Sequence, residues 1–424
     1  MVYVEKQREL EIKGEYDVIV CGSGPAGIGA AVTAGRNGVK TLLLEQNGTV
    51  GGVATSGLMS HFTGDCNSKI YREVLKRQAD ARIYQKGEIT TTIEPDVLMN
   101  VYFDMLKEAN VDVLLYTFVC DIITEDNDLK GVIVENKSGR SVYLSKVIID
   151  ATGDGDVAYK AGAEYFKGRE KDKKMQPATI MFKLGGVDYD RAVFPPSFET
   201  EVPTEKGELQ SLARKILPYP AGHVLLYKST LPGVVTVNMT NCTDVDATKA
   251  EDWTRATIVC RSQLSKIVNF LREYAPGYEN CYIVSSAPFL GIRETRHFKG
   301  LYSITENDIL EAKVFDDYVV KDAHFNFDIH NIDGSGLDKN GSQKNFTQNK
   351  GYTIPYRCLV PEKVDGLLLS GRNISGTHIA HSNFRAMPIC MGIGEAAGAA
   401  AALAIKKECK VREINAEEIR KIIM

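Results

Sequence analysis

The feature that most limits how this chain can fold is a glycine-rich stretch that directly follows an apolar run near its start. Residues 18–21 are apolar, Gly22, Gly24 and Gly27 follow, and a small-residue segment leads to a second apolar run that ends at Glu45. A strand, spaced glycines, a helix, a second strand and an acid, in this order, are typical of a dinucleotide-binding turn. We expect a ligand with a pyrophosphate and a ribose; the alternative is a glycine-rich turn without a ligand.

The three glycines have separate roles in such a turn. Gly22 lets the chain leave the strand tightly, Gly24 lets the backbone approach the pyrophosphate, and Gly27 lets the helix lie close to the sheet. Glu45 lies 18 residues after Gly27. A carboxylate there accepts hydrogen bonds from ribose hydroxyls and repels a 2′-phosphate, which disfavours NADP.

Composition narrows the function classes. The 424 residues are enough for two domains. The net charge is −4 and no basic tract is long enough for a nucleic-acid surface, so we expect a small-molecule substrate. Residues 1–13 lack the apolar core of a signal peptide, and the uncharged apolar run 396–405 is too short to cross a bilayer. We expect a cytoplasmic protein that does not bind membranes.

The nine cysteines include no CxxC pair and form no close group with histidines. This spacing argues against an iron–sulfur site, a zinc ribbon and a redox dithiol. We therefore expect no bound metal.

Hydrophobic patterning predicts the remaining elements. A glycine-rich loop at 51–57 follows Glu45, and its backbone would approach the inner half of a long cofactor. Helices are expected over 94–109, 254–274 and 388–407, strands over 111–123, 131–135, 142–149, 234–239 and 367–370, and a loop over much of 322–348. The strands between 111 and 149 predict a β-meander, and the last of them runs into a second glycine-rich turn at 150–156.

These features resemble flavoproteins of the glutathione-reductase-like fold: an early GxGPAG turn, a meander before a strand that ends in Ala151-Thr152-Gly153, and a late C-terminal return. The resemblance implies that the cofactor is FAD, that the 151–153 turn packs on the first strand beside the pyrophosphate site, and that Val119 lies beside the adenine. Flavin reductases with a dedicated NAD(P)H domain carry a second complete fingerprint, and none occurs here.

Later motifs are similar to a family of FAD-dependent oxidoreductases related to fumarate-reductase-type flavoproteins. They are GIRETR, DIH, GYTIPYRCLVP, GLLLSGR and MPICMGIGEAAGAAAA, and the match spans essentially the whole chain. The resemblance implies a cofactor and a reaction type and leaves the substrate open. The chain lacks the glycine- and asparagine-rich loop that fumarate reductases place before the last helix. The resemblance therefore does not imply that this chain acts on a dicarboxylate.

We therefore expect an α/β fold in which a Rossmann-like FAD-binding domain with an inserted β-meander, residues 1–165 and 351–424, is joined by a second α+β substrate or cap domain, residues 166–350. Amides near the start of the 388–407 helix would stabilise negative charge on the reduced flavin. The residues expected to bind FAD are Gly22, Gly24, Pro25, Ala26, Gly27, Glu45, Gln46, Gly52, Val53, Thr55, Val119, Ala151, Thr152, Gly153, Gly371, Arg372, Ile389 and Met391.

Polar segments in the last third of the chain supply the catalytic candidates. Arg293 and Arg357 are expected to bind an acidic group or a developing oxyanion. His330, Tyr356 and His378 are expected to transfer protons. The alternative for 293–296 is a structural ion-pair network between domains; His61 could face the flavin or pack in the core, and Arg385 could reach the flavin or substrate or cap the preceding strand.

The predicted function is hydride transfer between a small polar organic substrate and the flavin N5, with an external electron carrier. The alternatives are a flavoprotein subunit that reduces an unsaturated acid with electrons from a partner protein, and a non-enzymatic flavin redox sensor.

Overall fold

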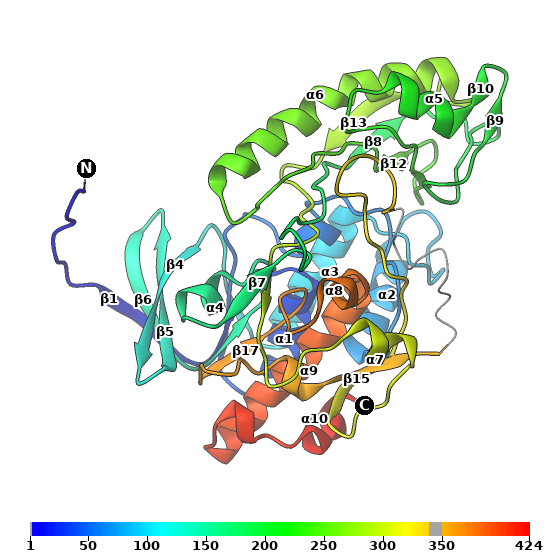
Figure 1. Ribbon diagram of the computed structural model, residues 1–424. Helices are drawn as coiled ribbons and strands as arrows, with labels where there is room; N and C mark the ends of the chain where they lie inside the picture. The colour runs from blue at the N-terminus through cyan, green and yellow to red at the C-terminus, as the bar shows by residue number, and fades with distance from the viewer. Residues whose placement is uncertain (1, 339–349) are drawn as a thin grey trace.

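The computed structural model describes residues 2–338 and 350–424. Its largest sheet joins strands from both ends of the chain, in the order β3-β2-β1-β6-β5-β4, and β17 also pairs with β6 (Figure 1). Strands β3, β2, β1, β6 and β17 run parallel, whereas β4, β5 and β6 form an antiparallel meander. The bounds are Glu11–Cys21 (β1), Thr41–Leu44 (β2), Asp112–Leu114 (β3), Phe118–Glu125 (β4), Asp128–Asn136 (β5), Gly139–Asp150 (β6) and Leu367–Leu369 (β17). The predicted α/β class with an inserted meander is confirmed.

The prediction of one strand over 111–123 is wrong. The chain forms two strands there, because Tyr116 adopts a left-handed backbone conformation with φ of 53° between them. The first, β3, pairs in parallel with β2, and the second, β4, pairs with β5. Alternating apolar residues continue through the break, so the sequence pattern alone did not reveal it.

Two helices from opposite ends of the chain lie side by side against this sheet. Helix α1 (Pro25–Arg36) follows the glycine turn, and α9 (Met387–Lys407) is near the C-terminus; Figure 1 shows both in the centre of the molecule. Gly38 follows the helix with φ of 78°, a conformation that suits glycine after a helix end. Helices α2 (Lys69–Ala81), α3 (Pro95–Glu108) and α10 (Ala416–Ile423) pack around this pair.

Glycines let the backbones of α1 and α9 touch. A Cβ added at Gly394 would lie 1.9 Å from the carbonyl oxygen of Ala26, and one at Gly398 would lie 2.3 Å from that of Ala30. Gly29 is equally constrained, since its Cβ would lie 2.4 Å from the carbonyl oxygen of Met391. No larger residue fits at these positions unless the helices separate.

Helix α9 is long and apolar enough to cross a membrane by length and composition, but 89% of its most apolar window is buried inside the protein. The uncharged apolar run 396–405 is only part of this helix. Burial on this scale is typical of a core helix.

Glu395 of α9 caps the start of α2. Its carboxylate accepts a hydrogen bond of 2.6 Å from the Ser68 hydroxyl and further bonds from the backbone N–H groups of Lys69 and Ile70. Burial raises the pKa of Glu395 to about 7, and the three hydrogen bonds oppose that rise. A buried side chain far along the sequence thus satisfies the free amides of a helix end.

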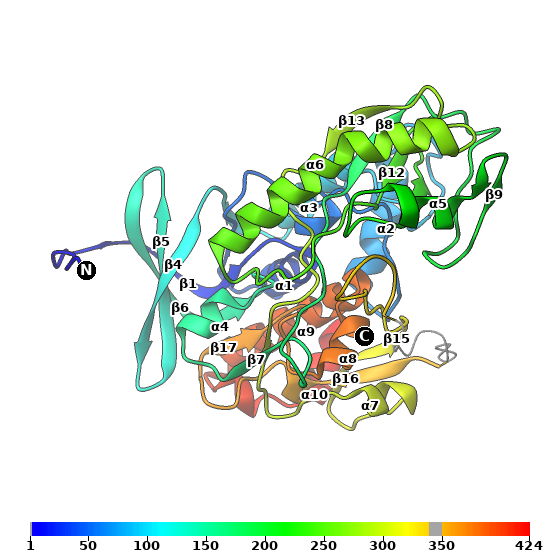
Figure 2. The ribbon, with the colours of Figure 1, turned by 45° about the horizontal axis from the view of Figure 1, so that its top comes forward.

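A second, smaller sheet lies at the top of Figures 1 and 2, where α6 crosses it. It is antiparallel, with the order β11-β12-β8-β13. Its own core is formed by residues such as Phe182, Val235 and Leu271, from β8, β12 and α6. The bounds are Phe182–Gly185 (β8), Leu226–Lys228 (β11), Val235–Val237 (β12), Tyr282–Ser286 (β13), Leu209–Ile216 (α5) and Ala250–Tyr274 (α6).

Shorter elements complete the fold. They are α4 (Asp156–Lys160), β7 (Tyr165–Lys167), β9 (Pro203–Thr204), β10 (Gly207–Glu208), β14 (Arg296–Phe298), α7 (Glu306–Leu310), β15 (Tyr318–Ala323), β16 (Tyr352–Pro355) and α8 (His378–Phe384). Within the loop expected over 322–348, residues 324–338 contain no helix and no strand, and 339–348 lie outside the described residues. The domain boundaries stay a prediction; Phe298, Ile304 and Val320 pack in the same core as the large sheet.

We expect Gly394→Ala to destabilise the protein by about 1–3 kcal/mol, because its Cβ would overlap the carbonyl oxygen of Ala26. The measurement is chemical unfolding of the cofactor-free protein followed by circular dichroism, so that differences in ligand affinity do not contribute. Gly24→Ala is the matched control, because a Cβ at Gly24 meets no protein atom within 4 Å. Equal stability of both variants would contradict the close contact of the two helices.

Candidate active site

In the turn between β1 and α1, two glycines are required by the fold and a third is not. A Cβ at Gly22, where φ is 95°, would lie 2.5 Å from the carbonyl oxygen of Ala151, and a Cβ at Gly27 would lie 1.9 Å from that of Gly22. At Gly24 the same addition meets nothing within 4 Å. Gly22 and Gly27 are therefore required by the protein's own packing, and Gly24 leaves room beside the backbone for a ligand.

The start of α1 fits a phosphate group. In the described structure no side chain caps this helix, and Pro25 occupies its first turn. The glycine-rich loop lies over the same turn, because the Gly51 N–H donates to the carbonyl oxygen of Ser23 and a Cβ at Gly52 would lie 3.0 Å from the Cα of Gly24. Free amides at a helix start and two glycine backbones are a suitable cradle for a pyrophosphate.

Glu45 lies at the end of β2, next to the glycine turn. Its carboxylate accepts hydrogen bonds from the Ser23 N–H (2.9 Å) and hydroxyl (2.6 Å), and from the backbone and side chain of Asn47. The acid is thus held against the turn, and its role at the ribose stays a prediction. Gln46 is exposed, the Thr55 hydroxyl donates to the carbonyl oxygen of Val50, and Val119 lies on β4 opposite Val134.

The 151–153 turn packs on the first strand, as the family resemblance implied. Ala151 donates its N–H to the carbonyl oxygen of Cys21, and Gly153 lies against the Arg372 guanidinium. Gly371, after β17, lies against the side chain of Ala26. The remaining expected cofactor residues lie in these same segments, namely Pro25, Val53 and Thr152, or are buried in the first turns of α9, namely Ile389 and Met391.

A second group of polar residues, here called the arginine–histidine site, comprises Arg293, Asp328, His330 and Arg385. Arg385 donates to a carboxylate oxygen (2.7 Å) and to the backbone oxygen (2.8 Å) of Asp328, and the His330 Nε2 lies 3.4 Å from the same carboxylate. Arg293 donates to the carbonyl oxygen of Pro177, and among the described residues no carboxylate lies within ion-pair distance of it. Two guanidinium groups therefore flank one acid and one imidazole.

Electrostatics keep the histidine of this site neutral. Burial and the neighbouring Arg293 lower the pKa of His330 to about 4, and burial with Arg385 lowers the pKa of Arg293 to about 10. Burial opposes ionisation of Asp328, but His330 and Arg385 outweigh it and hold the pKa of that carboxyl well below its usual range. These charged groups are mostly buried, with 19% of the Asp328 side chain and 14% of the Arg385 side chain exposed.

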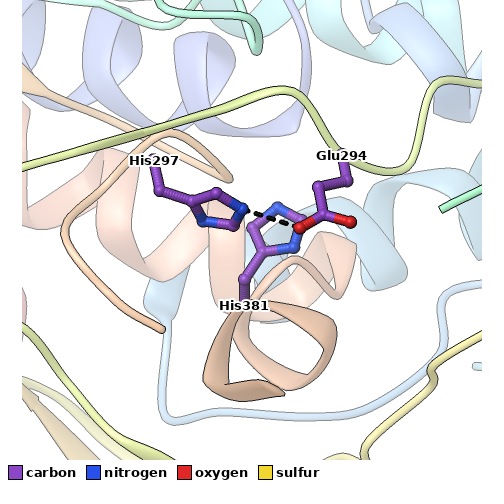
Figure 3. Close-up of side chains that lie close together, drawn as sticks. All are labelled: Glu294, His297 and His381. Carbon is purple, nitrogen blue, oxygen red and sulfur yellow. Dashed lines mark hydrogen bonds and ion pairs between the residues drawn. The ribbon is translucent and has the colours of Figure 1, made fainter. Parts of the chain in front are cut away.

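A third group, here called the Glu294 cluster, comprises Glu294, His297, His378 and His381. One oxygen of Glu294 accepts from His297 Nε2 (2.8 Å) and from His378 Nδ1 (2.6 Å). Figure 3 shows His297 and His381 next to this carboxylate, with the dashed line joining His297 to Glu294. Burial opposes ionisation, but these hydrogen bonds hold the pKa of Glu294 well below its usual range.

Two catalytic candidates lie elsewhere. Tyr356 donates its hydroxyl to the carbonyl oxygen of Val411, and burial raises its pKa. Arg357 pairs with Asp317 at 2.9 Å, and 47% of its side chain is exposed. Both line a surface hollow of about 380 Å³ that contains no residue of the arginine–histidine site. Their hydrogen-bond and ion-pair partners are Val411 and Asp317, so they lie outside the arginine–histidine site, and their catalytic role stays a prediction.

Other sequence expectations are resolved by the contacts. For Arg296 and Glu294 the contacts fit the structural alternative. Arg296 pairs with Asp156 and lies over the ring of Tyr159, and Glu294 pairs with two histidines. Sequence reasoning missed Gln176. Its backbone N–H donates to Glu294, and its side-chain amide oxygen accepts from the backbone N–H of His330 and from the Arg385 guanidinium. It lies in a charge-rich stretch with no motif. The i, i+3 spacings Glu294/His297 and His378/His381 were a signal that we overlooked.

Comparison with known proteins places these features in a family. Residues 17–423 match the family model described as FAD dependent oxidoreductase. Over 201 residues the chain is 25% identical to digeranylgeranylglycerophospholipid reductase 1 of Methanococcoides burtonii. This match covers 43% of this chain and 47% of the reductase. Over 175 residues it is 31% identical to a tRNA uridine 5-carboxymethylaminomethyl modification enzyme of Alkaliphilus metalliredigens, covering 35% and 27%. The chain thus spans less than half the length of these curated relatives.

Among solved structures, the flavin-dependent brominase Bmp2 has a similar fold. The TM-score is 0.50 at 13% identity, and the match covers 96% of this chain and 82% of the brominase. At this identity the likeness concerns the fold alone.

Gly24→Ala should weaken FAD binding while the fold stays intact, because the added methyl points to where no protein atom lies. Overpacking of about 1–3 kcal/mol corresponds to a loss of roughly ten- to hundredfold in affinity. The measurement is a titration of apoprotein with FAD, followed by flavin fluorescence. Unchanged affinity would remove Gly24 from the cofactor site.

Proposed function

We propose, because the chain belongs to the family of FAD-dependent oxidoreductases, that it transfers a hydride between a small polar organic substrate and FAD at the arginine–histidine site. The chain is an enzyme and its cofactor is FAD. What we propose is the type of reaction and the class of substrate. Its relatives bear the names of a reductase, a brominase and a tRNA-modifying enzyme, which do not select one reaction.

The observation that supports the proposal is the pairing of a partly accessible guanidinium with a neutral imidazole. Arg293 has donors left over after its bond to Pro177, and Asp328, which attracts it, forms its ion pair with Arg385. A guanidinium in this state binds a carboxylate or a hydroxyl that develops negative charge, with two parallel hydrogen bonds. His330 lies beside it, uncharged at neutral pH.

The residues divide the work as follows. Arg293 and Arg385 orient the oxygen of the substrate, and His330 accepts the proton that leaves it during oxidation or returns it during reduction. Asp328 holds the imidazole ring through the contact with Nε2. FAD, when bound, supplies the centre that accepts or donates the hydride. The residues proposed to hold it are those of the glycine turn, the 51–57 loop and the 151–153 turn.

The electron partner is also a proposal. A lone dinucleotide fingerprint fits an external carrier, or a nicotinamide that visits the flavin, rather than a resident NAD(P)H domain. We further propose that the protein acts in the cytoplasm on a small molecule.

The test is an anaerobic screen of hydroxy acids, sugars and amines for loss of flavin absorbance. One class should bleach the flavin without oxygen or nicotinamide. Bleaching by NAD(P)H alone, with oxygen uptake only when an aromatic or other substrate is added, would instead indicate a monooxygenase.

Arg293→Lys should slow flavin reduction by the identified substrate about ten- to hundredfold, because a charged hydrogen bond is worth about 1.5–3 kcal/mol. Flavin content should not change. Arg357→Lys is the matched control and should react at the wild-type rate, since Arg357 pairs with Asp317 at the surface. The measurement is stopped-flow absorbance; equal rates in all three proteins would exclude Arg293.

The pH profile of flavin reduction should report His330. Its lowered pKa means that the ring is neutral above about pH 4, so the rate should hold through pH 5–6 and fall only as the pH drops through about 4. Because an exposed histidine titrates near 6.5, a fall centred there would show that His330 is not the proton acceptor. Stopped-flow reduction with pH jumps limits exposure to acid, and His330→Asn should lack this step.

A further inference from the structure

The Glu294 cluster brings four potential ligands together from two segments. Glu294 lies just before β14 and His297 lies within it, and His378 and His381 lie on α8. Glu294, His297 and His381 are all buried, and one ligand atom of each lies within 4.8 Å of those of the others. Figure 3 shows the two imidazoles and the carboxylate facing one another.

Hydrogen bonding explains only part of this cluster. A single oxygen of Glu294 accepts the bonds from His297 and His378. The His381 ring lies edge-on to that of His297, with centroids 4.5 Å apart, and its buried Nδ1 has no hydrogen-bond partner in the described structure. A buried imidazole nitrogen without a partner is costly unless something else binds there.

We propose that Glu294, His297 and His381 bind a divalent transition-metal cation, with Zn²⁺ the best match. Imidazole nitrogen and carboxylate oxygen are donors that Zn²⁺ prefers. Two imidazoles and one carboxylate leave one position of a tetrahedron open, which water can occupy.

The spacing suits entry of the ion after a small adjustment. Ligand atoms around tetrahedral zinc lie roughly 3.3 Å apart, from bond lengths of about 2.0–2.1 Å. The present separations from the Glu294 oxygen are 2.8 Å to His297 and 2.6 Å to His378. The Glu294–His297 pair must open by about 0.5 Å, whereas the other separations, which reach up to 4.8 Å, must shorten by up to about 1.5 Å. The ring proton of His297 that now lies on Glu294 moves to the other nitrogen or to solvent.

The metal would tie α8 to the segment that carries Arg293. Glu294 follows Arg293 directly, and its second oxygen accepts the N–H of Gln176, whose side chain contacts His330 and Arg385. Through Gln176, the metal site would help to hold His330 and Arg385 in place. The inference concerns metal binding and does not depend on the proposed reaction.

The experiment uses the FAD-loaded protein purified without a polyhistidine tag. Metal content is measured by plasma mass spectrometry, and protein stripped with a chelator is titrated with zinc sulfate. About one Zn²⁺ per chain should bind, and the melting temperature should rise with zinc concentration because the ion binds only the folded state.

Variants separate the cluster from adventitious sites. His297→Gln and His381→Gln should each weaken zinc binding by more than about 100-fold, since even outer-shell partners are worth 10–100-fold. His324→Gln is the matched control, because His324 contacts only the carbonyl oxygen of Asp322 with its Nδ1 and lies outside the cluster. Flavin content and circular dichroism check that each variant is folded.

Two results would overturn the proposal. One is a folded, flavin-loaded wild type that takes up no zinc at millimolar concentration. The other is equal zinc affinity in the wild type and in a folded His297→Gln/His381→Gln double variant. Either would leave the cluster as a hydrogen-bonded network that positions Glu294.

Discussion

The direct backbone contact between α1 and α9 is the interaction on which the cofactor half of the molecule depends. The paired positions, Ala26 with Gly394 and Ala30 with Gly398, increase together, so the helices run in the same direction. With no side chain between them, their separation is fixed at its minimum. The glycine turn before α1 and the first turn of α9 are therefore held in one arrangement, with both positive helix ends on the same side.

Much of the fold could be predicted because local signals were strong. Glycines in the Gly22–Gly27 turn and periodic apolar residues in α3, α6 and α9 identified these elements nearly to their ends. The break at Tyr116 could not be predicted, because a tyrosine in a left-handed conformation carries no propensity signal. In the folded chain the Tyr116 N–H donates to the carbonyl oxygen of Asn47, a contact that local sequence does not signal.

The candidate site was predicted less completely, since it is assembled from segments far apart in the sequence. Arg293 and His330 were identified by residue chemistry and proved to be neighbours through Asp328 and Arg385. Tyr356 and Arg357 had the same chemistry but face Val411 and Asp317. Residue type indicates what a side chain can do, whereas only tertiary structure determines what it meets.

Strand β17 has a consequence for how the chain is made. It pairs with the last residues of β6, Ile148 to Asp150, although more than 200 residues separate the two strands. Until the ribosome has produced residues 367–369, that part of β6 has an unpaired edge, and α1 lacks its partner helix. A nascent or prematurely terminated chain therefore presents an apolar strand edge, which is the kind of surface that chaperones bind and aggregates grow from.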